Sequence, residues 1–438
     1  MENNNQYFDV DSVEYPAPGS NPSPSGRKRG SDGFFTGAMF GAMVTMLVVC
    51  VIYLGVTIGG QIQKRSQESQ EPQDRTEEEE GLLSAKVVQK IETLEELIDR
   101  MFYLHEVTDE ELTEGIYRGM LKALDDPYSV YYTKEEVEEL QMSTAGIYYG
   151  IGAYIMFDKE GNSTKISSVM PNSPAERAGL RANDLIYAID GESIYGMQTS
   201  DSVKLIKGEE NTEVVLSILR DGERMDVTVI RGKVETPTVV SRMLEDRMGY
   251  IQIVEFDDVT SGQFENALKD LKSQGMKGLI LDLRQNPGGN LDTVVEIGEM
   301  LLPKGLIVYT EDKNGKREEY RSNGKHEIDI PMTVLVDMNS ASAAEILAGA
   351  IQDYKKGTLI GTTTYGKGIV QAVRSLRDGS AVKITISSYF TPNGRNIHGV
   401  GIEPDIICEF DGETYYSTEG EVDNQLNKAK EVLAEMMK

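Results

Sequence analysis

A short apolar segment that turns directly into an alanine-rich helix places one serine at the junction. Residues 332–338 predict a buried strand, and the A-A-E-I-L-A-G-A-I stretch after Ser342 predicts a helix. Lys367 follows 25 positions later between two glycines, and Gln371 lies four residues beyond it. A serine hydroxyl is a weak nucleophile until a base takes its proton, and a desolvated lysine with a lowered pKa can be that base. Because the chain has only three histidines, the pattern favours Ser342 as nucleophile and Lys367 as base.

Three ordinary interpretations compete with this one. Ser342 and Glu345 have the spacing of a capping box, which starts a helix without any chemistry. Residues 361–367 match a phosphate loop until Gly368, which stands where the loop needs Ser or Thr, and a strand-like alternation follows instead of a helix. Lys367 could also be a surface residue in a glycine turn. The phosphate loop fails, while the cap and the surface lysine stay open on these residues alone.

Two motifs around these residues resemble the catalytic signature of the carboxy-terminal processing proteases, also called tail-specific proteases. S-A-S-A-A-E-I spans residues 340–346, and Y-G-K-G-I-V-Q spans residues 365–371, with Tyr where the family has Phe. The resemblance implies a serine peptidase with Ser342 as nucleophile, Lys367 as general base and Gln371 orienting the lysine. The pKa of such a base must fall from about 10.4 to about 7–8, so we expect Lys367 to be buried away from carboxylates.

A glycine-rich loop, R-Q-N-P-G-G-N at residues 284–290, follows the apolar strand expected at residues 279–283. Glycines let backbone N–H groups approach a ligand, as an oxyanion hole requires. The family has an R-N-N-x-G-G element here, which implies the N–H of Gly288 as one donor. The N–H of Ala343, at the positive end of the helix, is implied as the other. An ordinary glycine turn between strand and helix stays the alternative.

Composition argues against several other classes of protein. The formal charge of −28 argues against nucleic-acid binding. No cysteine and histidine cluster has metal-ligand spacing, so we expect neither a metal nor another cofactor. The two cysteines, Cys50 and Cys408, are not expected to pair.

The first 81 residues predict a membrane attachment. Residues 1–33 are polar and are expected to be a disordered cytoplasmic tail. Residues 34–58 are mostly apolar, long enough to cross a bilayer and too long for the core of a cleaved signal peptide. The flanking basic residues orient this helix only slightly, and the family resemblance implies export. We therefore expect a single-pass anchor in the cell membrane, an acidic linker over residues 59–81 and a protease outside the cytoplasm.

Two regions are expected between the linker and the protease. Residues 82–146 have helical spacing and contain D-D-P-Y-S at residues 125–129, an element that the family shares. Residues 147–234 contain short strands with S-P-A-E-R-A-G-L and I-D-G, which resemble a PDZ domain. PDZ domains add a peptide as a strand and hold its terminal carboxylate on backbone N–H groups. The resemblance implies a peptide site made of Tyr149, Gly150, Ile151, Gly152, Val203 and Ile206.

Alternating strands and helices over residues 235–420 predict an α/β protease core. The resemblance implies a core like the crotonase and caseinolytic peptidase folds. T-P-N-G-R-N-I-H-G-V-G-I-E-P-D, residues 391–405, is similar to a late family element that braces the site, and His398 within it is expected to be structural. A last helix is expected over residues 421–438.

Together these features predict a multidomain α/β protein, a membrane-anchored serine endopeptidase that recognises protein or peptide substrates by their C-termini. A homodimer and a regulatory protein partner stay open. One alternative is a non-catalytic PDZ scaffold, which would predict damage to the Ser/Lys pair, and none is visible. The other is a crotonase-type acyl-CoA enzyme, which leaves the PDZ domain and Lys367 without a role.

Overall fold

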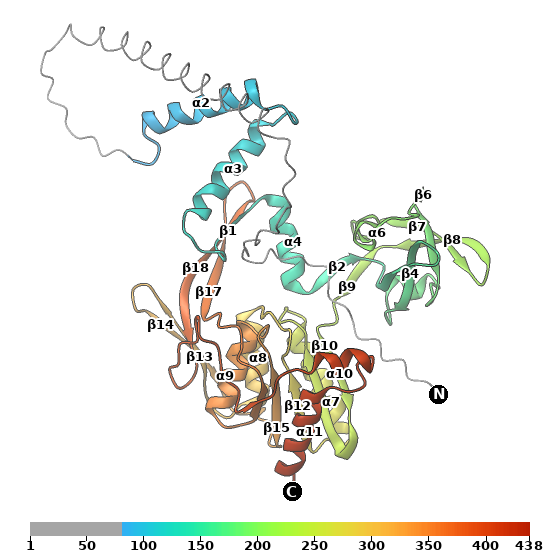
Figure 1. Cartoon of the computed structure of the whole chain (residues 1–438), viewed down its shortest axis with the longest axis vertical. Coiled ribbons are helices and arrows are strands. Elements are labelled where there is room, and N and C mark those ends of the chain that lie inside the picture. Colours follow the sequence, from blue (N-terminus) through green and yellow to red (C-terminus); the bar gives the residue numbers. More distant parts are fainter. Residues whose placement is uncertain (1–80) are drawn as a thin grey trace, which may run out of the picture. The chain divides into compact units, whose positions relative to one another are not determined.

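The structure, a computed structural model, describes residues 81–438 (Figure 1). The predicted tail over residues 1–33, the predicted anchor over residues 34–58 and all but the last residue of the predicted linker lie outside this range. Within residues 81–438, none of the helices combines the length and apolar composition needed to cross a bilayer. Contacts divide the chain into two units, whose described residues are 81–108 and 109–438.

The first unit is built around one helix, α2 (Ala85–Met101), where the helical spacing predicts it. The helix is amphipathic, but within residues 81–108 it buries none of its residues. Leu94 and Leu97 on its apolar stripe are exposed, as is Met101 at its end.

The second unit begins with two helices and one strand: α3 (Asp109–Lys122), β1 (Val130–Tyr132) and α4 (Lys134–Ala145). Thr133 and Glu136 close the capping box that their spacing predicts, and Gly146, at a φ of 65°, ends α4. β1 pairs antiparallel with β18 (Ala381–Phe390) of the α/β core, from Val130 opposite Lys383 onward. The region expected to be helical therefore also contributes a strand to the core.

The region expected to be a PDZ domain has its own sheet and its own hydrophobic core. Its sheet has the order β3-β4-β5-β7-β8, with the short β6 (Glu192–Ser193) beside β5. Ile166, Ile186 and Leu216 are fully buried in its core. Strands β2 and β9 pair antiparallel where the chain enters and leaves the domain. The bounds are β2 (Ile147–Gly150), β3 (Ala153–Asp158), β4 (Ser163–Val169), α5 (Pro174–Arg177), β5 (Leu185–Ile189), α6 (Thr199–Ile206), β7 (Glu213–Arg220), β8 (Glu223–Ile230) and β9 (Gly232–Glu235).

The core of residues 235–420 is organised by a six-stranded sheet with the order β10-β11-β12-β15-β16-β19. The four pairings from β11 to β19 are parallel, and the edge strand β10 pairs antiparallel with β11. The strands are β10 (Val239–Met243), β11 (Met248–Ile253), β12 (Gly278–Asp282), β15 (Met332–Val336), β16 (Thr358–Gly361) and β19 (Ile406–Ile407). The α/β order predicted from the sequence is confirmed here.

Both faces of this sheet are covered, as parallel sheets require. Ile251 and Leu281 face the larger core, which contains helices α7 (Thr260–Ser273), α8 (Leu291–Leu301) and α9 (Ala343–Asp353). The alternate residues Tyr250 and Ile280 face a second cluster with α11 (Asn424–Met436), which follows the short α10 (Gly412–Ser417). Figure 1 draws α11 in dark red beside β12 and β15.

A second sheet carries the segment with Lys367 and Gln371. Its order is β1-β18-β13-β14, and β17 also pairs with β18. Strands β17 (Ile369–Ser375) and β18 (Ala381–Phe390) form the long hairpin drawn in orange-red in Figure 1. The other strands are β13 (Gly305–Asp312) and β14 (Arg317–Ser322).

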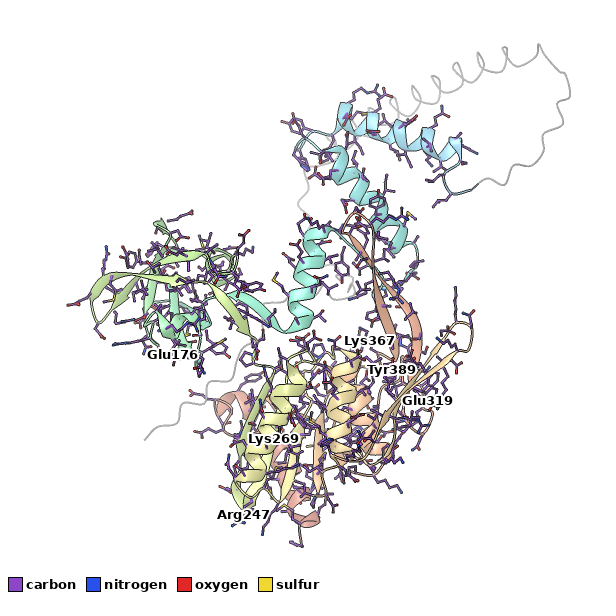
Figure 2. All side chains as sticks on the ribbon, turned by 180° about the vertical axis from the view of Figure 1, so that it is seen from behind. Glu176, Arg247, Lys269, Glu319, Lys367 and Tyr389 are labelled. Carbon is purple, nitrogen blue, oxygen red and sulfur yellow. The ribbon has the colours of Figure 1, made fainter. Side chains whose placement is uncertain are left out.

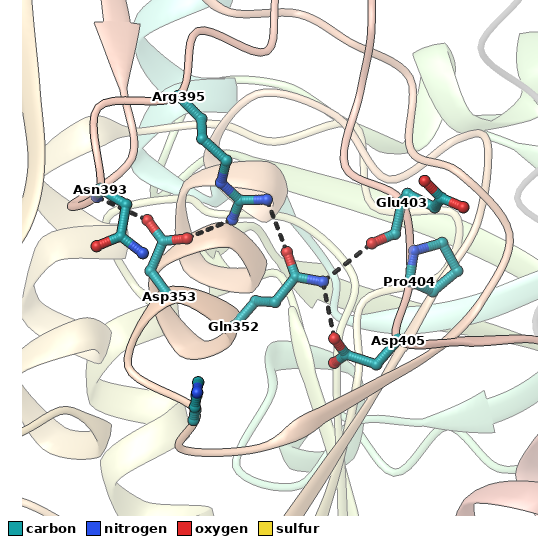
Figure 3. A pocket seen from close by; sticks show the side chains of 8 residues that line it. Gln352, Asp353, Asn393, Arg395, Glu403, Pro404 and Asp405 are labelled. Atoms are coloured by element: carbon teal, nitrogen blue, oxygen red, sulfur yellow. Dashed lines mark hydrogen bonds and ion pairs between the residues drawn. The ribbon is translucent and has the colours of Figure 1, made fainter.

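The late segment over residues 391–405 lies beside the end of α9, and together they line a polar pocket of about 460 Å³ (Figure 3). The Arg395 guanidinium donates to Asp353 Oδ1 at 2.5 Å and to Gln352 Oε1 at 2.9 Å. The Gln352 amide donates in turn to the Glu403 carbonyl and the Asp405 carboxylate. These bonds fix the end of α9, whose first turn follows Ser342.

We predict that Arg395→Ala lowers the free energy of unfolding of the core by about 1–3 kcal/mol, because it leaves the buried Asp353 carboxylate without its cation. Thermal and urea unfolding of the purified protein measure this loss. Arg321→Ala is the control, since Arg321 pairs with Glu319 in an exposed position and its loss should cost less than about 1 kcal/mol. Equal losses in the two variants would contradict a bracing role.

Candidate active site

Ser342 sits at the junction of β15 and α9 in a strained backbone conformation. Its φ of 50° and ψ of −112° lie far from the extended values that N-cap residues adopt. Such conformations cost about 1–3 kcal/mol and cluster at active sites. Ser342 and Glu345 have the arrangement of a capping box, but only the bond from the Ser342 N–H to Glu345 Oε2, at 2.9 Å, is well formed. This geometry disfavours the interpretation of Ser342 as a simple helix cap.

Two buried side chains hold the Ser342 backbone in this conformation. Its N–H donates to Glu345, and its carbonyl accepts a 3.0 Å hydrogen bond from the Tyr389 hydroxyl of β18. Tyr389 is 1% exposed, and burial raises the pKa of its hydroxyl well above the ordinary value, so it remains a donor at neutral pH. Figure 2 labels Tyr389 and Lys367, whose segments are joined by a hydrogen bond from the Tyr389 N–H to the Gly368 carbonyl.

Glu345 brings the segments of Ser342 and Lys367 together. Its Oε2 accepts the N–H groups of both residues, each at 2.9 Å. Its Oε1 accepts the Thr364 hydroxyl at 2.6 Å and the Gly366 N–H at 2.8 Å. The side chain is fully buried. Sequence reasoning took Glu345 for a capping residue and missed this role, although one acidic residue inside an otherwise apolar helix was a usable signal.

Lys367 is half-buried, and its amine lies 4.4 Å from the centre of the Tyr128 ring. Burial lowers the pKa of Lys367, and the charge of Lys383 lowers it further. The carboxylates of Asp126 and Glu345 act in the opposite direction and raise the pKa. The expectation that Lys367 lies away from carboxylates is therefore wrong, because two of them lie near enough to favour its ammonium.

Within residues 81–438, no hydrogen bond joins the Ser342 hydroxyl to the Lys367 amine in this structure. The two residues are nevertheless close, since their N–H groups share one oxygen of Glu345. Catalytic hydrogen bonds are often long in a protein without substrate and tighten when substrate binds.

Gln371 contacts the neighbouring strand rather than the lysine amine. Its side-chain amide donates to Thr385 Oγ1 at 3.2 Å, across the β17–β18 pair. The Thr385 hydroxyl donates to Asp126 Oδ2 at 2.7 Å. The predicted orientation of Lys367 by Gln371 thus has no direct hydrogen bond behind it among the described residues, only a connection through Thr385 and Asp126.

Gly288 lies against the serine, as an oxyanion donor would. A Cβ on Gly288 would come within 2.7 Å of Ser342 Cβ and 3.0 Å of the Ala343 nitrogen, and its φ is 109°. The Gly288 N–H, however, donates to Asn286 Oδ1 at 2.8 Å. Ala343 is the first residue of α9, where the helix dipole favours negative charge. The structure thus brings Gly288 and the Ala343 nitrogen together as predicted, but the Gly288 N–H is already bonded to the Asn286 side chain.

Two further residues fix the glycine loop and were missed by sequence reasoning. Asn286 is fully buried, its amide donates to the Ile253 carbonyl, and its own carbonyl accepts the Ala341 N–H. Arg284 forms an ion pair with the buried Asp282 and another with Asp423, the residue that caps α11. These bonds connect the loop to β11, to the Ser342 turn and to the C-terminal helix.

His398 contributes its backbone to the lysine turn. A side chain on Gly368 would collide with the backbone of His398, and the Gly399 N–H donates to the Gly366 carbonyl. The imidazole itself is on an exposed residue. This arrangement agrees with the structural role expected for His398.

The six residues predicted for the PDZ peptide site lie around β3 and α6, which pack together. Ile151 and Ile206 are 3% and 5% exposed and belong to the hydrophobic core of the domain. Val203 is half-buried on α6, and Gly152 has a φ of 75° that suits a tight backbone turn. Tyr149 and Gly150 end β2, where the Gly208 N–H donates to the Tyr149 carbonyl.

Comparison with protein families finds three matches in this chain. Residues 247–408 match peptidase family S41, residues 165–220 match a PDZ domain, and residues 46–136 match the N-terminal domain of the activating protease CtpB. Along the chain the N-terminal match comes first, the PDZ match second and the peptidase match last.

Individual relatives are similar over most of this chain. A probable CtpA-like serine protease of Staphylococcus aureus is 37% identical over 323 residues, 73% of this chain and 64% of the relative. The carboxy-terminal processing protease CtpA of Bacillus subtilis is 36% identical over 309 residues, 70% of this chain and 66% of the relative. A solved photosystem II D1 C-terminal processing protease is 31% identical, with a TM-score of 0.43 over 72% of this chain and 86% of that one.

The alignments thus span slightly less than two thirds of the length of these curated relatives. The order of the three family matches and the level of identity nevertheless confirm the family predicted from the sequence. The chain belongs to the carboxy-terminal processing proteases of peptidase family S41, with a PDZ domain beside its protease core.

Proposed function

We propose that this protein is a membrane-anchored serine endopeptidase that acts outside the cytoplasm, docks substrate C-termini in its PDZ domain and cleaves with Ser342 and Lys367. One observation carries the chemistry: a single oxygen of the buried Glu345 accepts the N–H groups of both residues. The strained Ser342 backbone and the lowered pKa of Lys367 support the same assignment. The anchor and its orientation rest on the sequence of residues 34–58 and on the family.

The proposed reaction proceeds through an acyl-enzyme. The neutral Lys367 amine takes the proton of the Ser342 hydroxyl while that oxygen bonds to the substrate carbonyl carbon. The N–H of Ala343 stabilises the oxyanion, joined by that of Gly288 once it leaves the Asn286 side chain. The lysine ammonium then gives its proton to the leaving amine as the C–N bond breaks. Water, deprotonated by Lys367, then bonds to the acyl carbon, and the ammonium returns a proton to the Ser342 oxygen as the ester bond breaks.

The two alternatives now have less support. The match to a peptidase family disfavours the crotonase-type enzyme. A scaffold with a decayed site would not need a buried carboxylate that receives four hydrogen bonds between Ser342 and Lys367. Partners other than substrates, including a second copy of the chain or a regulatory protein, remain proposals.

We expect Ser342→Ala to reduce cleavage of an unfolded protein by roughly 10⁴-fold or more, because alanine has no hydroxyl to attack the substrate carbonyl carbon. The measurement uses the full-length protein in detergent and follows product formation by mass spectrometry. Ser273→Ala, at an exposed serine on α7, serves as the control and should cleave normally. Cleavage that survives Ser342→Ala would remove Ser342 from the mechanism.

The pH dependence follows from the base. Only neutral Lys367 accepts a proton, and its pKa is lowered, so kcat/KM should rise with pH through a limb below the ordinary lysine value of 10.5. Activity is lost below this limb because the amine is protonated there. Lys367→Arg, which stays protonated, should be inactive at every pH tested while the protein remains folded. A profile without this limb would argue against a lysine base.

We predict that Gly288→Ala lowers kcat by at least about 100-fold, because the new methyl group would displace Ser342 or the Ala343 amide. The unfolding temperature of the PDZ domain should change little. Steady-state kinetics and circular dichroism test this. Gly262→Ala, on α7 with open space around it, is the matched control and should leave kcat unchanged. Equal kcat values for the two variants would contradict a role of Gly288 in the oxyanion hole.

A further inference from the structure

A turn outside the S41-matched residues lies at the proposed base. The turn over residues 125–129 precedes β1, whereas the S41 match begins at residue 247. The ring of Tyr128 lies under the Lys367 amine, with 4.4 Å between the nitrogen and the ring centre. The Tyr128 hydroxyl is 3.4 Å from that of Tyr365, two residues before the lysine. Tyr128 therefore contacts both the amine of Lys367 and the loop that carries Lys367.

Asp126 fixes this turn to the hairpin that carries Gln371. Its carboxylate accepts the Tyr128 N–H at 3.0 Å, the Ser129 hydroxyl at 2.6 Å and the Thr385 hydroxyl at 2.7 Å. The Ser129 oxygen accepts the Thr385 N–H at 3.1 Å, and β1 then pairs with β18. The turn is thus attached to β18 by side-chain hydrogen bonds and by the backbone pairing of the strand that follows it.

A lysine base needs such a support. Its amine ends a flexible four-carbon stem, whereas a base must stay within reach of the proton it takes. An aromatic face attracts an ammonium group, and a nearby carboxylate favours the charged form. The other titratable groups that face the amine are Glu345 from α9, Lys383 from β18 and Tyr365 from the lysine's own loop.

We propose that Tyr128 and Asp126 are positioning residues for Lys367, supplied to the protease core by the turn over residues 125–129. The Tyr128 ring holds the amine in place, and Asp126 holds the turn that supplies this ring. Gln371 contributes to the same support through Thr385. This inference rests on the proposed function for its consequence in catalysis, while the contacts themselves do not depend on it.

The first experiment separates the ring from its hydroxyl in the full-length protein in detergent. Tyr128→Phe keeps the ring over the amine, so kcat should stay within about threefold of wild type. Tyr128→Leu keeps a similar apolar side chain without the ring, and kcat should fall about tenfold or more with KM little changed. Thermal unfolding checks that both variants fold. Equal kcat for Phe and Leu would overturn the role of the ring.

The second experiment tests the charge by titrating the lysine amine directly, in protein labelled with ¹³C at the lysine ε-carbon. The Lys367 signal is assigned by its loss in Lys367→Arg. Asp126 raises the pKa of Lys367, so Asp126→Asn should move both the titration and the low-pH limb of kcat/KM to lower pH. Asp378→Asn is the matched control, because Asp378 also accepts a backbone N–H and a serine hydroxyl within a short turn.

The outcomes distinguish this inference from the proposed function. A Lys367 titration that Asp126→Asn leaves unmoved, or that Asp378→Asn moves equally, overturns the inference even if the protein is an active protease. Absence of cleavage by the wild type would count against the proposed function, whereas the titration would still decide whether Asp126 acts on Lys367.

Discussion

The candidate site depends on one buried carboxylate. Glu345 lies inside the core with no exposed surface and accepts four hydrogen bonds, two from the Ser342 and Lys367 backbones and two from the intervening loop. A buried charged group is tolerated only when its bonding capacity is filled. The same requirement therefore forces the strand-to-helix turn and the lysine turn to meet. The strain at Ser342 persists because Glu345 and Tyr389 fix the serine backbone from both sides.

The residues of the candidate site could be located from the sequence because they lie in short, contiguous motifs. Ser342 and Ala343 belong to one strand-to-helix junction, and Lys367 belongs to one glycine turn. The resemblance of these motifs gave the family, and the structure adds that Gly288 lies against Ser342. The α/β core and the PDZ domain were also predictable, since their strands and helices follow local periodicity. In the part of the chain that the structure describes, these elements appear where their patterns indicate.

What the sequence did not predict depends on contacts between distant segments. The pairing of β1 with β18 joins residues about 250 positions apart, and no local pattern encodes such a pairing. Tyr128 and Asp126 reach Lys367 only because of it. The same pairing explains why the carboxylate of Asp126 lies near the lysine, contrary to expectation. Glu345 was misjudged for another reason, because a glutamate at this helix position is an ordinary cap wherever the helix is exposed.

Arg284 shows how late in the chain the site is completed. Its guanidinium donates to Asp423 and Gln425, which follow it by 139 and 141 residues, and it is the first residue of the glycine loop beside Ser342. Of the side chains that bond to this guanidinium in the structure, only Asp282 precedes it in the chain. The glycine loop beside Ser342 therefore gains two of its side-chain partners only when the segment that begins the C-terminal helix is in place.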